Sequence, residues 1–549
     1  MSPRDEEKQD MSKVITAQEA ARLIQDGVTI GASTQGLSGW AEEVAIAIEE
    51  RFMQTGRPRN ITLVHSCTCG DYKKRGTTHL GHEGLIKRLI CGHTLTSPNM
   101  INLIEQDKIE CYLLPQGVIC QLWRAIAGKK IGVLTSVGLG TFVDPRIDGA
   151  KITSLTKEEL VKVVEVEGQE LLLFKPFPVD VALIRGTYAD ENGNLTMDNE
   201  SVIMEALPLA MAAKNSGGIV IAQAHNLASA NSLHPKNVKV PGTLIDYVVI
   251  AKPENHHQTQ QTYYSPVLAG HIKVPLAGIP TIPLDARKII GRRAAAELSA
   301  GGVINLGVGI PAVIPSVIAE EGLTGRVTTT TELGVFGGVP TIGLDFGGAI
   351  NAEAMIEHAS MFDFYDGGGL DVTFVGMAQV DKNADVNVSR FGNRVAGPGG
   401  FINITQNSKK VVFCGMFSTG SEEIVENGRL RITKEGKSKK FIGKVEQITF
   451  SGEYARRRNA PVLFVTERCV FSLENGELVL TEIAPGVDLE RDIIGMMDFR
   501  PGISPRLKSM DETMFLPEWG RLKEILGDRK EVRGYENGEG AAEKLVVAS

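Results

Sequence analysis

The chain has 549 residues, of which 42% are hydrophobic and 23% charged, and its formal net charge is -8. This length exceeds what one hydrophobic core supports, so we expect two domains or two large halves. The negative charge argues against a general nucleic-acid-binding protein. The seven cysteines, odd in number and widely spaced, argue for reduced thiols rather than a disulfide framework.

The N-terminal segment MSPRDEEKQD is charged and polar. It lacks the apolar core of a signal peptide, and no apolar run in the sequence approaches the roughly 18 residues of a membrane span. We therefore expect a cytoplasmic protein without a membrane partner, beginning with a short disordered leader at residues 1–13.

Patterns in the first half of the chain return in the same order in the second half. For example, a helix-like pattern, a glycine and a strand-like run occur in EAARLIQDGVTIG (19–31) and again in AAELSAGGVINLG (295–307). The matched segments are 19–31 with 295–307, 178–195 with 370–386, 214–223 with 406–415, and 238–242 with 448–452. Four matched pairs of segments in the same order indicate a duplicated unit.

Helix-like patterns alternate with short Val/Ile-rich runs in both halves, which is typical of mainly parallel sheets covered by helices. We predict an α/β fold with two homologous halves, at residues 14–284 and 285–530, and a C-terminal tail at 531–549. The boundary falls near PLDARKII (283–290), after the Pro- and Gly-rich stretch VPLAGIPTIP.

The strand-like run TTTT (328–331) ends at Glu332, and glycines follow closely. Most glutamates in this position are solvated loop charges. However, ligands of parallel α/β folds bind at the carboxyl ends of strands. A carboxylate with an ordinary pKa of about 4.3 is ionised at neutral pH and can attack an activated acyl group without a histidine to activate it. Attack on a thioester and return of the thiolate would suit movement of CoA between two carboxylic acids.

Such chemistry needs hydrogen-bond donors for an oxyanion and exclusion of water. LLPQG (113–117) places the side-chain amide of Gln116 on a turn after a strand-like run, and AGPGGF (396–401) offers backbone N–H groups. Taken alone, these residues are as compatible with a surface turn and a plain loop.

Several segments resemble the family I CoA-transferases, especially the single-chain acetate/propionate and short-chain acyl-CoA transferases. TELGVFGG (331–338) resembles the family's Ser/Thr-Glu-x-Gly signature, and PQG (115–117) its Pro-Gln-Gly turn. Further similar segments are GTFVDPR (140–146), GGGLDVTFVGMAQVD (367–381), GPGGF (397–401) and EIAPGVDLERDI (482–493). The resemblance runs from about residue 14 to about residue 525 and implies the CoA-transferase fold.

The resemblance also implies site residues and a ping-pong mechanism. Glu332 would form a covalent glutamyl-CoA thioester, and Gln116 would stabilise the oxyanion. Gly397, Gly399 and Gly400 would lie on the CoA side. The substrates would be an acyl-CoA and a short-chain carboxylate, with CoA as substrate and covalent intermediate and no metal or permanently bound cofactor. A homo-oligomer, dimer or tetramer, is expected.

The loop GASTQGLSGW (31–40) departs from the family pattern by adding polarity and bulk. If Ser33, Thr34 and Gln35 face the substrate pocket, the acid could be a hydroxy or longer acid rather than acetate; otherwise these side chains point away. Two further functions stay open: an acyl-CoA hydrolase, in which water reaches the thioester, and a non-catalytic acyl-CoA-binding protein.

Overall fold

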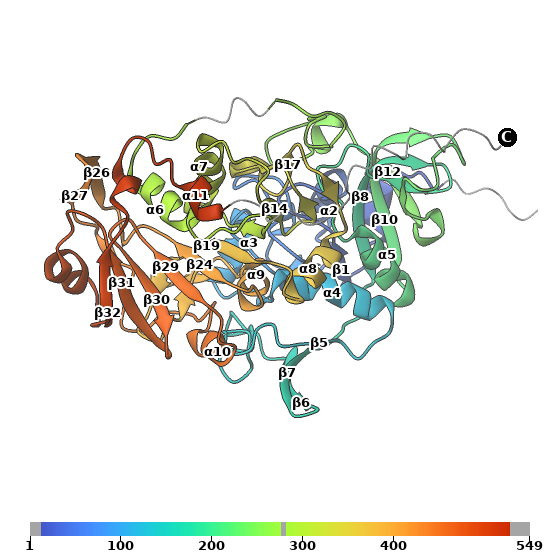
Figure 1. Ribbon diagram of the computed structural model, residues 1–549. Coiled ribbons are helices and arrows are strands. Elements are labelled where there is room, and N and C mark those ends of the chain that lie inside the picture. Colours follow the sequence, from blue (N-terminus) through green and yellow to red (C-terminus); the bar gives the residue numbers. More distant parts are fainter. Residues whose placement is uncertain (1–12, 276–280, 528–549) are drawn as a thin grey trace, which may run out of the picture.

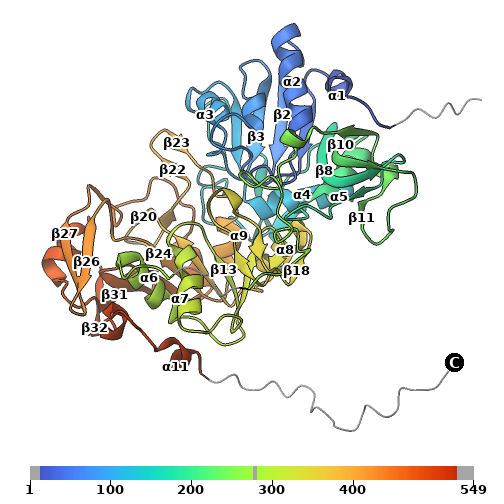
Figure 2. The same ribbon diagram turned by 90° about the horizontal axis from the view of Figure 1, so that it is seen from above.

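The computed structural model describes residues 13–275 and 281–527. The N-terminal half, blue to green, and the C-terminal half, yellow to red, each contain a large sheet and lie side by side in both views (Figures 1 and 2). No helix within these two ranges is long and apolar enough to cross a membrane.

The N-terminal sheet has seven parallel strands in the order β12-β10-β8-β1-β2-β3-β4. Their bounds are β1 Thr29–Ala32, β2 Ile61–His65, β3 Ile86–Cys91, β4 Glu110–Leu113, β8 Val181–Asp190, β10 Ile219–Ala228 and β12 Tyr247–Ile250. The antiparallel strands β9 (Leu195–Thr196) and β11 (Val238–Val240) extend from β8. A separate three-stranded sheet consists of β5 Val133–Thr135, β6 Val161–Val166 and β7 Gln169–Phe174.

The C-terminal sheet has ten strands, five of them in the parallel order β14-β13-β19-β24-β29. These five are β13 Val303–Leu306, β14 Thr328–Thr331, β19 Val372–Gly376, β24 Val411–Cys414 and β29 Val462–Val465. The other five are β15 Val335–Phe336, β18 Ala354–Met355, β30 Cys469–Glu474, β31 Glu477–Ile483 and β32 Gly502–Ser509. Short hairpins branch from this half, among them β22 (Arg390–Phe391) with β23 (Arg394–Val395).

The helices pack on these sheets. In the N-terminal half they are α1 Ala17–Leu23, α2 Glu42–Thr55, α3 Pro98–Glu105, α4 Gln116–Ala127 and α5 Ala206–Asn215. In the C-terminal half they are α6 Ala286–Ala295, α7 Ile314–Glu320, α8 His358–Asp366, α9 Phe401–Gln406, α10 Gly452–Arg457 and α11 Leu522–Leu526.

The predicted duplication is visible in strand order and in matched hydrogen bonds. The order β2-β1-β8-β10-β12 in the first half corresponds to β14-β13-β19-β24-β29 in the second. Before β8, the Asp180 carboxylate accepts a 2.8 Å hydrogen bond from the backbone N–H of Thr29, and before β19 the Asp371 carboxylate accepts one of 2.8 Å from Val303. The α/β fold class with two homologous halves and mainly parallel sheets is thus confirmed. The predicted leader and tail lie almost entirely outside the described residues.

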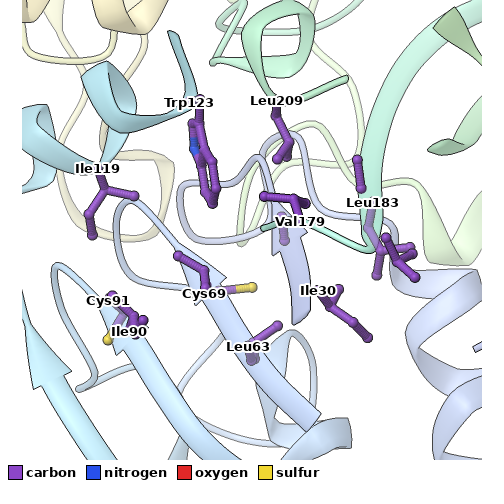
Figure 3. Close-up of a cluster of buried hydrophobic side chains, with 14 of the residues drawn as sticks. Ile30, Leu63, Cys69, Ile90, Cys91, Ile119, Trp123, Val179, Leu183 and Leu209 are labelled. Carbon is purple, nitrogen blue, oxygen red and sulfur yellow. The ribbon is translucent and has the colours of Figure 1, made fainter. Parts of the chain in front are cut away.

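Close packing in the N-terminal core fixes helix α4. Gly31 lies in β1, where a Cβ atom would be 2.6 Å from Cδ1 of Leu209 on α5 and 3.3 Å from the ring of Trp123 on α4. Glycine therefore lets both helices approach the strand. Figure 3 shows Trp123 and Leu209 pointing from their helices toward Val179 and the buried strand residues. Because α4 is held rigidly, its first residue, Gln116, has a fixed position at the edge of the sheet.

Candidate functional site

A cavity of about 430 Å³ lies between the two halves and is lined by both. The N-terminal half contributes Gln116, and the C-terminal half contributes Glu332 and the loop 397–400. A second cavity, of about 550 Å³, shares Gly307 and Val308 with the first. The carboxylate, the amide and the glycine loop singled out from the sequence are thus brought together in one place.

Strand β14 places Glu332 at the carboxyl end of the sheet. Its threonines fix the strand: Thr330 Oγ1 donates to the Ile304 carbonyl at 2.8 Å, and Thr331 Oγ1 donates to the Gly347 carbonyl at 2.8 Å. Gly334, two residues beyond Glu332, has φ +100°. This backbone conformation favours glycine, so the chain can turn away immediately after the carboxylate.

The Glu332 carboxyl group is buried and has no cationic partner among residues 13–275 and 281–527. Its side chain makes a contact with its own backbone N–H, and among the described residues no other side chain is hydrogen-bonded to it. Burial raises the pKa of Glu332, an effect reduced by that backbone hydrogen bond and by nearby His358. An unpaired carboxylate in a partly dehydrated cavity is a better nucleophile than one held in a salt bridge.

The glycine loop of the second half is hydrogen-bonded to the first half beside Gln116. The backbone N–H of Gln116 donates to the Gly399 carbonyl at 2.9 Å, and the N–H of Gly399 donates to the Gly92 carbonyl at 2.8 Å. Gly397 has φ +90°, and a Cβ atom there would lie 2.5 Å from the Gly92 oxygen. The loop therefore needs glycine at 397 in order to reach the cavity wall.

The Gln116 side chain is hydrogen-bonded to His358, which is in turn hydrogen-bonded to Glu205, and the sequence patterns revealed neither residue. Its Nε2 lies 2.9 Å from Nε2 of His358, and Nδ1 of His358 lies 2.7 Å from the Glu205 carboxylate. All three side chains are fully buried. Gln116 and His358 are the first residues of α4 and α8, and Glu205 immediately precedes α5. No local spacing links them, because they meet only when three helices converge.

The three predicted pocket residues lie in different environments. Gln35 lines the cavity, and its Oε1 is buried without a hydrogen-bond partner among the described residues. Ser33 instead accepts a 3.2 Å hydrogen bond from the backbone N–H of Glu205, and Thr34 contacts the sulfur of Cys69 at 3.6 Å. Neither Ser33 nor Thr34 is among the residues that line the cavity.

His93 also lines the cavity, and the sequence patterns did not assign it to this site. Burial lowers its pKa to about 4, so its ring is neutral at physiological pH. Its Nδ1 is buried, and no described residue forms a hydrogen bond with it. Together with Gln35 it gives the cavity two unpaired polar atoms that could bind a polar ligand group.

Comparisons with known proteins identify relatives of this chain. The family model described as Coenzyme A transferase matches residues 14–251. A caffeate CoA-transferase of Acetobacterium woodii is 51% identical over 94% of this chain and 100% of its own length. The acetate CoA-transferase YdiF of Escherichia coli K12 is 42% identical over 92% of this chain and 95% of its own length.

A crystal structure of the acyl-CoA transferase YdiF from E. coli O157:H7, described as a thioester complex with CoA, superposes with a TM-score of 0.87. It is 39% identical and covers 93% of this chain and 97% of that chain. The resemblance inferred from the sequence is therefore confirmed, and the chain belongs to the coenzyme A transferase family.

Proposed function

We propose that the protein is a CoA-transferase that moves CoA from an acyl-CoA to a carboxylic acid through a covalent glutamyl-CoA thioester on Glu332. The observation that carries this proposal is the pairing of two groups in one cavity. Glu332 supplies a buried carboxylate without a cationic partner, and Gln116 supplies an amide from the opposite half. The name of the E. coli thioester complex supports the same intermediate.

The chemistry needs no oxidant and no net proton transfer. A Glu332 carboxylate oxygen attacks the thioester carbonyl, the C–S bond breaks, and the products are an acyl-glutamyl anhydride and CoA thiolate. The thiolate then attacks the glutamyl carbonyl, which gives the glutamyl thioester and releases the first acid as carboxylate. A second acid reverses the two steps and leaves as its CoA thioester.

Gln116 is the side-chain donor in this scheme. Each tetrahedral intermediate carries a negative oxygen, and a well-placed N–H donor is worth about 3 to 4 kcal/mol in the transition state. Gln116 begins helix α4, so the positive end of the helix dipole adds to the same stabilisation. We propose that Gly399 and Gly400, which line the same cavity, let the backbone approach the CoA side.

We also propose how the two cavities divide the substrate. The 550 Å³ cavity shares Gly307, Val308, Gly343 and Phe346 with the catalytic cavity, and all its lining residues lie between positions 282 and 346. It suits the long pantetheine arm of CoA, with the exposed Arg287 at its edge as a partner for phosphate. The N-terminal side of the catalytic cavity then holds the acyl group.

The proposal also concerns the identity of the carboxylic acid that accepts CoA. The unpaired atoms of Gln35 and His93 favour an acid with polar substituents beyond its carboxylate. The relatives named for acetate and for caffeate differ widely in their acids, so we propose that acetate, propionate, lactate and a hydroxycinnamic acid form the decisive acceptor panel. The homo-oligomeric state that the family resemblance implies and the cytoplasmic location expected from the sequence complete the proposal.

Two alternatives make different predictions for the same site. An acyl-CoA hydrolase would let water reach the glutamyl thioester, whereas the Glu332 residue is only 7% exposed. A non-catalytic acyl-CoA-binding protein would gain nothing from a buried, unpaired carboxylate, which costs stability.

Intact-mass measurement tests the proposal. Wild-type protein mixed with acetyl-CoA or propionyl-CoA, without an acceptor, should gain the mass of CoA and lose it when an acid from the panel is added. Glu332→Ala, treated identically, should gain nothing. Steady consumption of acyl-CoA without an adduct would favour the hydrolase, and binding without consumption would favour the binding protein.

A further inference from the structure

We propose that His358 and Glu205 are positioning residues, which fix the amide of Gln116 in the orientation that serves the oxyanion. This inference rests on the proposed function. It assigns a role to a buried hydrogen-bonded chain, Glu205–His358–Gln116, in which Glu205 and Gln116 belong to the N-terminal half and His358 to the C-terminal half.

The hydrogen-bonding capacities of the three groups determine the direction of the chain. An ionised carboxylate only accepts, so Glu205 requires Nδ1 of His358 to carry the proton. A ring protonated at Nδ1 alone accepts at Nε2, and Nε2 then faces an N–H of Gln116 rather than its carbonyl oxygen, as in the 2.9 Å contact. The tautomer and the amide orientation are therefore set by one carboxylate.

The remaining contacts hold Glu205 in place. Ser66 Oγ donates to its other oxygen at 2.6 Å, and the Glu205 backbone N–H donates to Ser33 Oγ at 3.2 Å. The backbone N–H of His358 donates to the Met204 carbonyl at 3.2 Å, which anchors α8 beside the start of α5. Both ends of the chain are thus tied to rigid elements, which is what precise positioning requires.

A second observation concerns the amide oxygen of Gln116. The Oε1 of Gln116 is buried and has no hydrogen-bond partner in the part of the chain that the structure describes. An unsatisfied buried carbonyl is unfavourable, so an unconstrained amide would turn to find a donor. The bond to His358 prevents that rotation and leaves the second N–H of Gln116 for the substrate.

The same neighbourhood could be interpreted as a metal site, because ligand atoms of Cys120, Glu205 and His358 approach within 4.8 Å of one another. The hydrogen bonds argue against this interpretation. Nδ1 of His358 and the near oxygen of Glu205 already bind each other, and Ser66 occupies the other oxygen. Cys120 lies 3.5 Å from the same Nδ1 and contributes packing.

A pair of substitutions at one position separates the two bonds of His358. In His358→Gln the side-chain carbonyl can occupy the place of Nε2 and accept from Gln116, whereas His358→Asn can reach Glu205 but not Gln116. We expect His358→Asn to lower kcat for CoA transfer about 10- to 100-fold with little change in KM, since misplacing one donor costs part of the 10²- to 10³-fold effect of removing it. The kcat of His358→Gln should be at least several-fold higher than that of His358→Asn.

A double-mutant cycle with Gln116→Ala shows whether His358 acts through the amide. In the Gln116→Ala background, the added substitution His358→Asn should lower kcat by less than about 2-fold, because the Gln116 amide that His358 positions is absent. An equal factor in both backgrounds, or equal losses for the Asn and Gln variants, would mean a merely structural role and would overturn the proposal.

Two controls complete the test. The variant Cys120→Ala changes the packing beside His358 and removes a possible metal ligand. Its kcat should stay within about 2-fold of the wild-type value. Stoichiometric metal in the purified wild type would overturn the positioning role. The CoA adduct of the wild type is measured first. If it is absent, the proposed function and this inference both fall; if it forms, a wild-type kcat in His358→Asn overturns this inference alone.

Discussion

At the scale of single residues, Glu332 combines burial with the lack of a counter-charge. Within the described ranges no Lys, Arg or His forms a salt bridge with it, and burial raises its pKa. The ionised form that a nucleophile needs is therefore the form that the fold disfavours. Such a conflict is common where a site gains activity at the expense of stability.

We predict that Glu332→Gln abolishes the CoA adduct and stabilises the protein by about 0.5 to 2 kcal/mol at pH 7 to 8. A carboxyl group with a raised folded-state pKa is neutral in both states at low pH, so it costs nothing there. The folded protein loses stability as the pH rises from the unfolded-state pKa of this group, about 4.3, through its folded-state pKa. The gain in Tm should consequently be small near pH 4.5 and larger at pH 8.

Thermal unfolding of both proteins across this pH range measures the effect. Glu332→Ala serves as the comparison, because it removes the same charge but leaves a space. A constant difference in Tm at every pH would contradict the assignment of the cost to the ionised carboxylate.

At the scale of elements, the sequence was sufficient to predict the duplicated α/β unit and the strand that ends at Glu332. Both depend on local patterns: a repeated helix-glycine-strand order, and a threonine strand followed by glycine. The antiparallel strands β30 and β31 belong to a segment without a counterpart in the first half, so the repeat could not predict them.

The positioning groups could not be predicted for a different reason. Glu205 precedes helix α5 and His358 begins helix α8, 153 positions apart, and no motif relates them. Similarly, Ser33 and Thr34 belong to a polar loop whose sequence does not show which side chains face inward. Only the packing of α4, α5 and α8 determines these directions.

The glycine loop 397–400 provides a prediction at this scale. Gly397→Ala should lower the rate of adduct formation about tenfold or more and destabilise the protein by roughly 1 to 3 kcal/mol. The reason is that its Cβ atom would meet the Gly92 oxygen at 2.5 Å and push the loop away from Gln116. Rapid-quench mass measurement and thermal unfolding report the two effects.

Gly392→Ala is the matched control. It also has a positive φ, +57°, but lies in the exposed turn between β22 and β23 with nothing within 4 Å of an added Cβ. It should share the backbone strain and keep the wild-type adduct rate. Equal rate losses in the two variants would mean that strain, rather than the approach of the loop to Gly92, is responsible.

At the scale of the whole molecule, the cavity that holds Gln116 and Glu332 lies where the halves meet. Their cores interlock: Cys120 of α4 is buried in a cluster of the C-terminal half, and Val395 and Ile402 are buried in the N-terminal cluster. Ile282 and Leu284 pack against a C-terminal cluster. We therefore propose that the boundary between the halves lies a few residues before the predicted position 284, ahead of residue 281.

This arrangement predicts that a chain broken within residues 276–280 assembles from its two parts when they are co-expressed. Neither part alone should form a CoA adduct, because Gln116 and Glu332 lie on different parts, and the complex should form it. Arg124 of α4 tests the interface: it forms ion pairs with Glu357, at 2.7 Å, and with Asp363 across the boundary.

In the broken chain, Arg124→Ala should raise the Kd of the two parts about 3- to 10-fold, because partly exposed ion pairs contribute about 1 kcal/mol. In the intact chain it should change the adduct rate less than about 2-fold, since the covalent connection supplies an effective concentration in the millimolar range. Titration of one part into the other, followed by adduct mass, measures both quantities. If an isolated part forms the adduct, the site does not require both halves, and the shared-cavity interpretation is wrong.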